Sequence, residues 1–279
     1  MPELPELEVV CEVLQRRVIG QTITQVQVLQ PGGPIVVRDL THSGFESTLT
    51  GATFAGVKRR GKFLVFSFQS ELPEFFLVVN PKLTGRLQLS EPAEKKMPKT
   101  HVLFTLSNGK QLRYVDLKRM GQLYVTHDIN SIPDYAGMGP ESLDVSLEDF
   151  RLRLKPFRGE IKGVLTRGDF LAGIGNAYAD EILWEARLYP YRKRTQLTAE
   201  EIDRLYTAMR TTLLTSIEKV RVEMGENIHL KPRDFMAVHM KTGQPCPRCG
   251  TPISLVGANQ RITNFCRTCQ PGGLIKGIR

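Results

Sequence analysis

The chain has 279 residues, of which 41% are hydrophobic and 24% are charged. This composition is ordinary for a globular protein of about two domains and excludes wholesale disorder. No apolar run approaches the ~18 residues of a membrane span, and no secretory leader pattern opens the chain, so we expect a cytosolic protein. Lys and Arg number 38 against 29 Asp and Glu. This excess favours a polyanionic partner, nucleic acid before an anionic membrane, and a merely basic enzyme is the alternative.

The first predicted element is a helix over residues 5–18, where apolar residues recur at helical spacing and a proline suits the first turn. From about residue 22 to 126 the pattern changes to short β-rich runs separated by turn signals, among them Asn108-Gly109. This region predicts an antiparallel sandwich or barrel. A polar stretch rich in Pro and Gly, roughly 127–145, predicts a linker.

Helical periodicity dominates the next part of the chain. Residues 147–155 and 176–188 fit amphipathic helices, and a third helix is expected after Thr198, which forms a capping box with Glu201. From about residue 238 we expect only short elements, separated by Gly and Pro, and this part of the chain carries most of the cysteines.

Four of the five cysteines form two Cys-x-x-Cys pairs, Cys246 with Cys249 and Cys266 with Cys269. This spacing is typical of a tetrahedral four-thiolate zinc site, and two disulfides are the alternative. Because four protein ligands leave no open coordination position, we expect one structural Zn²⁺ that also supplies the folding energy of a small ribbon. Arg261 lies between the pairs and suits phosphate binding, although it could equally be a solvated surface arginine.

The opening residues Met1-Pro2-Glu3 suggest a second chemistry. Removal of Met1 would expose Pro2 as a secondary amine, and an α-amino group with a pKa of about 7.7–8.0 is roughly one-tenth unprotonated at neutral pH. Such an amine can attack an aldehyde-level carbon and form an iminium, which keeps its positive charge and acts as an electron sink. Glu3 could act as the general acid/base. The alternative is that these residues only lead into the first helix.

Four blocks of the sequence together resemble the formamidopyrimidine-DNA glycosylase (Fpg, MutM) branch of the Fpg/Nei family. They are the Met-Pro-Glu-Leu-Pro-Glu start, the β-rich N-terminal half, the segment from Gly173 to Trp184, and the cysteine finger that ends Cys269-Gln270. The resemblance covers essentially the whole chain. It implies an α+β fold with three domains: an N-terminal β-sandwich with its lead helix (1–130), a helix-two-turn-helix domain (131–237) and a zinc finger (238–279).

The resemblance also implies a bacterial cytoplasmic monomer, associated with the nucleoid, that acts on damaged double-stranded DNA and not on membranes. Pro2 would be the Schiff-base nucleophile and Glu3 the general acid/base. Lys62 falls at the position of the family's hairpin lysine, and Arg261 matches a finger arginine that clamps phosphate and has a role in δ-elimination. A solvated turn lysine is the alternative for Lys62.

Further residues match DNA contacts of the family. Asn176, at a glycine-rich turn, would hold phosphates flanking the lesion, although a simple helix cap is the alternative. Arg158 falls at the position of a basic DNA contact of the family, and Glu6 is also assigned to the DNA-binding residues. In a segment where the family has histidines, Lys99 retains one basic contact.

The sequence departs from the family in the segments that fill the hole left by a flipped base. The usual His-x-x-Met element reads Asn80 to Thr84, so that Leu83 replaces the methionine wedge, and an apolar body can still unstack bases. The usual Asp-Pro-Arg-Arg-Phe-Gly becomes a segment containing Lys118, Arg119 and Met120. Lysine is a point donor and cannot make the bidentate contact of arginine, so the preference for cytosine opposite the lesion is put in question.

Three functions are compatible with these observations. The first is a bifunctional DNA glycosylase/AP lyase of base excision repair that excises oxidised purines, 8-oxoguanine and formamidopyrimidines, and cuts the strand by β,δ-elimination. The second keeps this chemistry but acts on oxidised pyrimidines or other adducts, as the altered segments suggest. The third is a paralogue that binds damage without cutting.

Overall fold

The computed structural model describes residues 1–69, 74–257 and 262–272. The chain divides into two compact units. The first unit comprises residues 1–137 and 217–232, and the second comprises residues 138–216 and 233–279. The three-domain division with boundaries at residues 130 and 237 stays a prediction. No helix in the described ranges is both long enough and apolar enough to cross a membrane.

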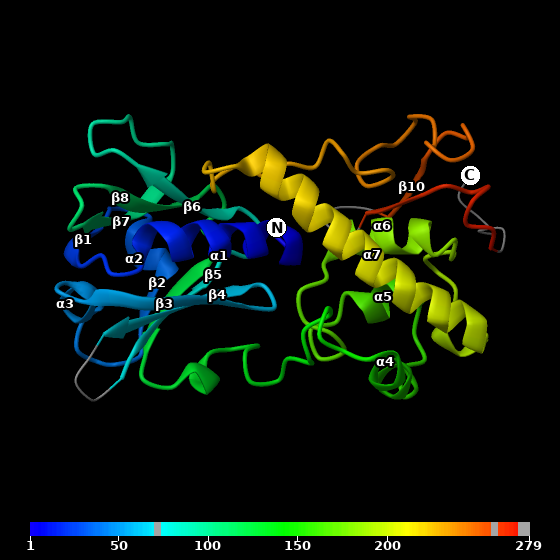
Figure 1. The fold of residues 1–279 in the computed structure, drawn as a ribbon, viewed down its shortest axis with the longest axis horizontal. Helices are drawn as coiled ribbons and strands as arrows, with labels where there is room; N and C mark the ends of the chain where they lie inside the picture. Colours follow the sequence, from blue (N-terminus) through cyan, green and yellow to red (C-terminus); the bar gives the residue numbers. More distant parts are fainter. Residues whose placement is uncertain (70–73, 258–261, 273–279) are drawn as a thin grey trace. The chain divides into compact units, whose positions relative to one another are not determined.

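Two β-sheets and a long N-terminal helix form most of the first unit (Figure 1). The helices and strands of this unit are α1 (Leu4–Val18), β1 (Ile23–Val28), α2 (Gly33–Val36), β2 (Val37–Asp39), α3 (Phe45–Leu49), β3 (Thr53–Arg60), β4 (Phe63–Gln69), β5 (Phe76–Asn80), β6 (Gly85–Ser90), β7 (Thr100–Leu106), β8 (Gln111–Asp116), β9 (Gln122–Thr126) and the 3₁₀ turn η1 (Ile129–Ser131). One sheet has the strand order β2-β9-β5-β4-β3 and the other β1-β7-β8-β6. All pairs are antiparallel except β2 with β9, so the predicted antiparallel architecture is confirmed with one parallel edge.

The core of the first unit lies around α1 and between the sheets. The apolar positions of α1 recur at helical spacing and are buried, as predicted, and α1 lies between the two sheets in Figure 1. Strand β4 alternates buried and half-buried residues, and its Phe66 and Phe68 pack on Phe54 of β3 with ring centroids 5.6 and 5.1 Å apart. Aromatic and β-branched residues suit such pleated, half-buried surfaces, which is why these runs form strands.

The second unit is helical and ends in a small hairpin. Its elements are α4 (Leu147–Leu154), α5 (Ile161–Leu165), α6 (Asn176–Glu185), the 3₁₀ turn η2 (Arg194–Gln196), α7 (Ala199–Met224), β10 (Ser254–Val256) and β11 (Thr263–Phe265). The predicted capping box is present, since the Thr198 N–H donates to Glu201 Oε2 (2.9 Å) and the Glu201 N–H donates to Thr198 Oγ1 (3.2 Å). Helices α2, α3 and α5 were not predicted, because four or five residues are too few to show a helical period.

The last turns of α7 belong to the first unit and are joined to α1 by ion pairs. Arg221 pairs with Glu12 (2.7 Å), and Glu226, just beyond α7, pairs with Arg17 (2.7 Å). Because Glu12 and Arg17 are part of α1, these pairs hold the end of α7 and the residues just after it against the helix that begins near Pro2.

Candidate active site and metal centre

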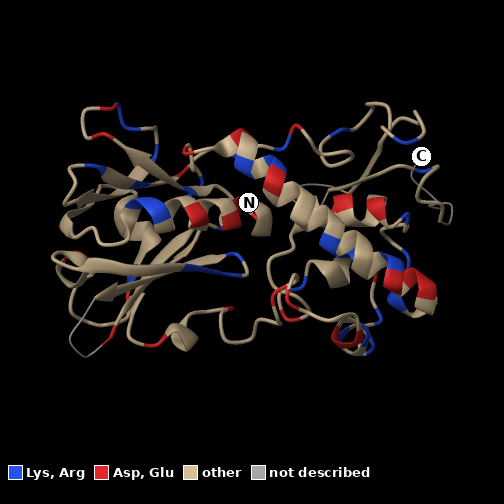
Figure 2. Ribbon diagram, in the orientation of Figure 1, with Lys and Arg blue, Asp and Glu red and all other residues tan. Residues whose placement is uncertain are grey.

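Lys62 stands in a tight turn between β3 and β4. Arg60 pairs with Phe63 across the hairpin, so Gly61 and Lys62 form the connection. Gly61 has a φ of 57°, in the left-handed region that two-residue hairpin turns require. Figure 2 shows that the strand leading into this turn ends in a basic stretch, which the sequence gives as Lys58, Arg59 and Arg60.

Arg59 joins this hairpin to α1. Its guanidinium pairs with Glu8 of α1 and also donates to the Gly61 carbonyl (3.2 Å), and its side chain is only 10% exposed. The Gln15 side chain donates to the Val57 carbonyl (2.9 Å) further along the same helix. The hairpin turn is therefore anchored to the helix that begins next to Glu3.

Glu3 and Lys62 are brought close enough to interact electrostatically. Burial lowers the pKa of the Lys62 amine, the positive charge of Lys82 lowers it further, and the negative charge of Glu3 opposes both. A lysine with a lowered pKa carries a larger neutral fraction, and perturbed groups of this kind are common at functional sites.

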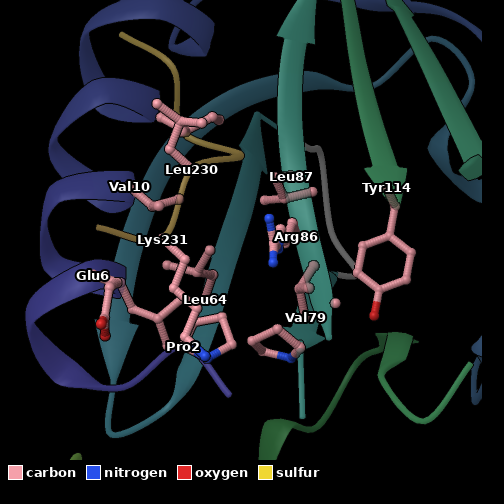
Figure 3. A pocket seen from close by; sticks show the side chains of 14 residues that line it. Pro2, Glu6, Val10, Leu64, Val79, Arg86, Leu87, Tyr114, Leu230 and Lys231 are labelled. Atoms are coloured by element: carbon pink, nitrogen blue, oxygen red, sulfur yellow. The ribbon is translucent and has the colours of Figure 1, made fainter. Parts of the chain in front are cut away.

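Pro2, Glu3 and Glu6 are all buried at the start of α1. The Glu3 backbone N–H donates to the Glu6 carboxylate (2.8 Å), so Glu6 satisfies one of the free amide groups at the helix N-terminus. Pro2 lines a cavity formed by α1, both sheets and the segment after α7, with Leu64 and Val79 beside it in Figure 3. The volume of this cavity is about 20 Å³, which leaves room for about one water molecule and is too small for a nucleobase.

The two altered segments of the first unit are linked through Asp116. Leu83 lies half-buried in the turn from β5 to β6, and the neighbouring Thr84 hydroxyl donates to the fully buried Asp116 carboxylate. The same carboxylate accepts the N–H of Lys118 (3.2 Å) and of Gly121 (2.8 Å). One buried acid therefore fixes both the Leu83 turn and the loop after β8.

The side chains of that loop face solvent. Lys118, Arg119 and Met120 are exposed, and Arg119 has a φ of 53°. Lys99 is also exposed, and its carbonyl accepts the Asp116 N–H (3.0 Å), which places it beside the same loop. The structure thus brings together five of the predicted DNA contacts around Asp116: Leu83 by way of Thr84, and Lys99, Lys118, Arg119 and Met120. Arg158 is exposed in the second unit, between α4 and α5.

Asn176 is the first residue of α6 and contacts the finger hairpin. Its side-chain amide donates to the Ile262 carbonyl (2.9 Å), and Lys162 Nζ donates to the same oxygen (2.9 Å). Ile262 follows Arg261 in the sequence, and Arg261 itself lies outside the described residues. The glycine-rich turn and the base of the finger hairpin are thus adjacent.

The four predicted ligand cysteines form one cluster. Their Sγ atoms all lie within 4.8 Å of one another, with 3.4 Å between those of Cys249 and Cys266 and 3.9 Å between those of Cys246 and Cys269. Four thiolates at ~2.3 Å from one Zn²⁺ would be about 3.8 Å apart, so the donor set fits a tetrahedral zinc. All five cysteines are free thiols.

Hydrogen-bond donors surround the cluster, although burial raises the pKa of the Cys266 and Cys269 thiols. The Trp184 indole N–H donates to Cys246 Sγ (3.4 Å), and the Cys269 N–H donates to Cys266 Sγ (3.5 Å). Hydrogen bonds from Thr251 lower the pKa of the Cys249 thiol to about 6. Such donors orient and stabilise metal-ligating sulfur atoms.

Sequence reasoning missed a buried polar network that holds the finger against α6. Lys162 pairs with the fully buried Asp180 (2.7 Å), whose other oxygen lies 2.8 Å from His239 Nδ1. Glu181 accepts three backbone N–H groups from residues 237–239 at 2.8–2.9 Å. Burial raises the pKa of Glu181, and these hydrogen bonds oppose the rise. Two adjacent acids inside an apolar helix were the only available signal in the sequence.

Comparison with protein-family models matches three parts of the chain. Residues 1–123 match the formamidopyrimidine-DNA glycosylase N-terminal domain, residues 137–225 the H2TH domain of the same enzyme, and residues 243–272 the zinc finger found in FPG and IleRS. These matches define a class of protein, the DNA glycosylases that combine an H2TH domain with a zinc finger.

Among individual proteins, the formamidopyrimidine-DNA glycosylase of Symbiobacterium thermophilum is 35% identical over 97% of this chain and 90% of its own length. A solved complex of a Lactococcus lactis FPG mutant with Fapy-dG containing DNA has a TM-score of 0.84 at 28% identity, covering 97% of this chain and all of that one. A complex of the wild-type Lactococcus lactis protein with DNA containing an oxidised pyrimidine has a TM-score of 0.82 at 28% identity, with the same coverage. The chain belongs to the formamidopyrimidine-DNA glycosylase family, which confirms the resemblance and the predicted fold class.

Proposed function

We propose that the protein is a bifunctional DNA glycosylase/AP lyase of base excision repair that excises oxidised purines from double-stranded DNA. The observation that carries the proposal is the arrangement at the start of α1, where Pro2 and Glu3 are adjacent and the charge of Glu3 acts on Lys62, fifty-nine residues later in the chain. A flipped nucleotide is required because the reacting sugar carbon is inaccessible inside the base stack.

The chemistry follows from a secondary amine. Once Met1 is removed, the Pro2 nitrogen bonds to the sugar C1′ while the bond to the base breaks and the base leaves with a proton. Opening of the sugar ring gives an iminium with no N–H proton to lose, so its positive charge withdraws electrons from the adjacent carbon. Loss of a proton there expels the 3′ phosphate (β-elimination), and a second elimination releases the 5′ phosphate.

Glu3 and Lys62 supply the remaining charges of this mechanism. Glu3 exchanges the protons that ring opening and elimination require. Lys62, on its anchored turn, contributes a cation near the reacting sugar, and its lowered pKa also allows it to accept a proton. Arg261 is assigned to a phosphate and to δ-elimination by the family resemblance.

The DNA contacts are assigned to both units. Asn176, at the N-terminus of α6, suits phosphate binding because helix N-termini attract anions. Lys99 and Arg158 are exposed cations available to the backbone. Leu83 serves as the wedge, and Lys118, Arg119 and Met120 face the base opposite the lesion. Glu6 supports this set by holding the backbone of Glu3.

The cysteine cluster holds one structural Zn²⁺, with Cys246, Cys249, Cys266 and Cys269 as its ligands. The ion supplies folding energy to the finger and takes no part in the reaction, because four thiolates fill its coordination sphere. The three parts at 1–130, 131–237 and 238–279 act as catalytic domain, helical DNA-binding domain and finger. The protein works as a cytoplasmic monomer that reaches the nucleoid through DNA.

Oxidised pyrimidines are the second candidate substrate. The Lactococcus lactis relative has been crystallised with such a lesion, and the Leu83 and Lys118 segments of this chain depart from the usual family pattern. The retained Pro2, Glu3 and Lys62 argue against a paralogue that only binds damage.

The test is borohydride trapping on a duplex with an abasic site, after mass spectrometry has established whether Met1 is removed. The wild-type protein should form a covalent adduct, and Pro2→Gly should lose most of it. Pro5→Ala, a change at a second proline of the same helix start, should trap normally. Wild-type trapping by Pro2→Gly, or an active form that retains Met1, would overturn the assignment. Excision of 8-oxoguanine, formamidopyrimidine and thymine glycol then separates the two substrate classes.

A further inference from the structure

The C-terminal end of α6 carries an arginine where the backbone favours glycine. Arg187 has a φ of 55°, its N–H donates to the Trp184 carbonyl (3.2 Å), and the Leu188 N–H donates to the Leu183 carbonyl (2.9 Å). This is the hydrogen-bond pattern of a Schellman helix end, whose left-handed residue is usually glycine because a Cβ is crowded there. Arg187 therefore occupies this position at a conformational cost that glycine would not have, which raises the question of what its guanidinium group binds.

Arg187 lines an open pocket of the second unit together with Arg192, Arg204 and Arg248. The remaining lining residues are Glu201, Thr268, Cys269 and Pro271. Glu201 of the lining pairs with Arg192, and Glu185 beside the pocket pairs with Arg248, so the four guanidinium groups and these two carboxylates leave a formal charge of +2. Figure 2 shows acidic and basic residues intermixed on the first turns of α7, which contribute Glu201 and Arg204 to the pocket.

Three of these arginines are held in place by neighbouring groups. Arg192 pairs with Glu201, and Arg248 pairs with Glu185 (2.8 Å) while stacking on Trp184, with its guanidinium carbon 3.9 Å from the ring centroid. Arg204 donates through Nε to the carbonyl of residue 186, directly before Arg187 (2.8 Å). The pocket is thus largely preorganised, and it already binds carboxylates in two of its ion pairs.

Arg187 itself makes no ion pair with any described residue. Arg204 is only weakly satisfied, since its terminal nitrogen lies 3.9 Å from Glu201 and its side chain is 45% exposed. Two adjacent cations on a concave surface attract an anionic ligand and can donate charge-assisted hydrogen bonds to it.

We propose that this pocket, lined by four arginines, binds carboxylates of an acidic peptide segment in a partner protein. Arg187 follows the C-terminus of α6 and Asn176 begins it, so ten helical residues, ~15 Å, separate the pocket from the proposed phosphate contact. The open shape accepts an extended chain, and the guanidiniums already pair with carboxylates. The proposal does not depend on the Pro2 chemistry.

The experiment measures fluorescence anisotropy of a labelled oligoglutamate peptide at low ionic strength, with the zinc-loaded protein saturated by a duplex that carries a tetrahydrofuran abasic analogue. The duplex occupies the DNA-binding surface, so remaining peptide binding reports another site. Arg187→Gly and Arg204→Gln should each weaken binding about fivefold, the effect of losing one partly exposed charge pair. Arg153→Gln removes the same charge from an exposed face of α4 outside the pocket and should leave the affinity unchanged.

Arg187→Gly also restores the residue that the helix end prefers, so its thermal midpoint should be equal to or higher than that of the wild type. A loss of peptide binding with that midpoint retained cannot be explained by unfolding. The proposal is overturned if the duplex displaces the peptide completely, if Arg153→Gln loses as much affinity as Arg187→Gly, or if both pocket variants bind like the wild type. It is also overturned if inorganic tripolyphosphate binds with this variant pattern while the peptide does not.

Discussion

The cysteine cluster of the second unit differs in construction from one end of the first unit, where the start of α1 (Pro2 and Glu3) lies near the β3–β4 turn with Lys62. We call the latter region the α1–hairpin end. The four cysteines come from 24 consecutive residues, and two tight turns bring their sulfur atoms within 4.8 Å. Glu3 and Lys62 are fifty-nine residues apart in the chain and interact electrostatically, and the Lys62 hairpin is joined to α1 by the Arg59–Glu8 ion pair and by the hydrogen bond from Gln15 to Val57. Local spacing determines the first geometry, whereas tertiary packing determines the second.

This difference predicts how each region fails. The zinc proposed for the cluster would be a ligand outside the chain, so its loss should unfold the cluster as a whole while the first unit keeps its own core. The α1–hairpin end depends on side-chain contacts, so single substitutions should misplace it by small amounts and leave the fold intact.

The largest effect is expected from removal of the metal. Chelation, or Cys266→Ser, removes binding energy of about 10 kcal/mol for a structural zinc and should unfold the finger, abolishing binding to an abasic-site duplex. Hydrogen exchange should show protection lost around β10 and β11 and retained in α1 and the two sheets. Binding that persists after metal loss has been verified by elemental analysis would show that the finger is not needed for docking.

Loss of the proposed acid/base should come next. Glu3→Gln should lower single-turnover excision by about 10²- to 10⁴-fold, because proton transfer is removed while the side chain keeps its size. Gel-shift affinity for the same duplex should change little. A Glu3→Gln rate within a factor of about three of wild type would exclude Glu3 from the role.

A smaller effect is expected when only the anchor of the hairpin is removed. Glu8→Gln breaks the ion pair with Arg59 and should lower the single-turnover rate about tenfold through misplacement of Lys62, with DNA affinity largely kept. Glu12→Gln is the matched control, since it breaks an ion pair of the same helix, with Arg221, that does not reach the hairpin. Equal losses in both variants would indicate a general weakening of α1 and not positioning.

The sequence predicted the elements with strong periodicity and the site with a local spacing rule. Helix α1, the strands and the cysteine cluster were predictable because each is encoded by a local pattern: helical spacing, short β-rich runs and the Cys-x-x-Cys pairs. Short helices such as α2 and α3 have no readable period, and neither does a contact such as Lys162 with Asp180, which depends on how separate helices pack.

The role of Asp116 illustrates the same limit. Leu83 and Lys118 could be aligned with the family one by one, but their connection through Thr84 and the buried Asp116 carboxylate follows only from the pairing of β6 with β8. A residue's identity can be compared in sequence, whereas the group that fixes its position is found in the fold.

The smallest effect concerns the stability contribution of Lys62. Because burial lowers its pKa in the folded state, the unfolded chain binds more protons between that lowered pKa and the ordinary lysine value of about 10.4. The free energy of unfolding should therefore rise with pH across this interval, as the penalty for a buried charge disappears. Lys62→Met removes the titrating group, so urea titrations from neutral pH to about pH 10 should show the wild type gaining stability relative to the variant. Parallel pH profiles for the two proteins would mean that Lys62 keeps its charge at no cost, and that Glu3 compensates for its burial completely.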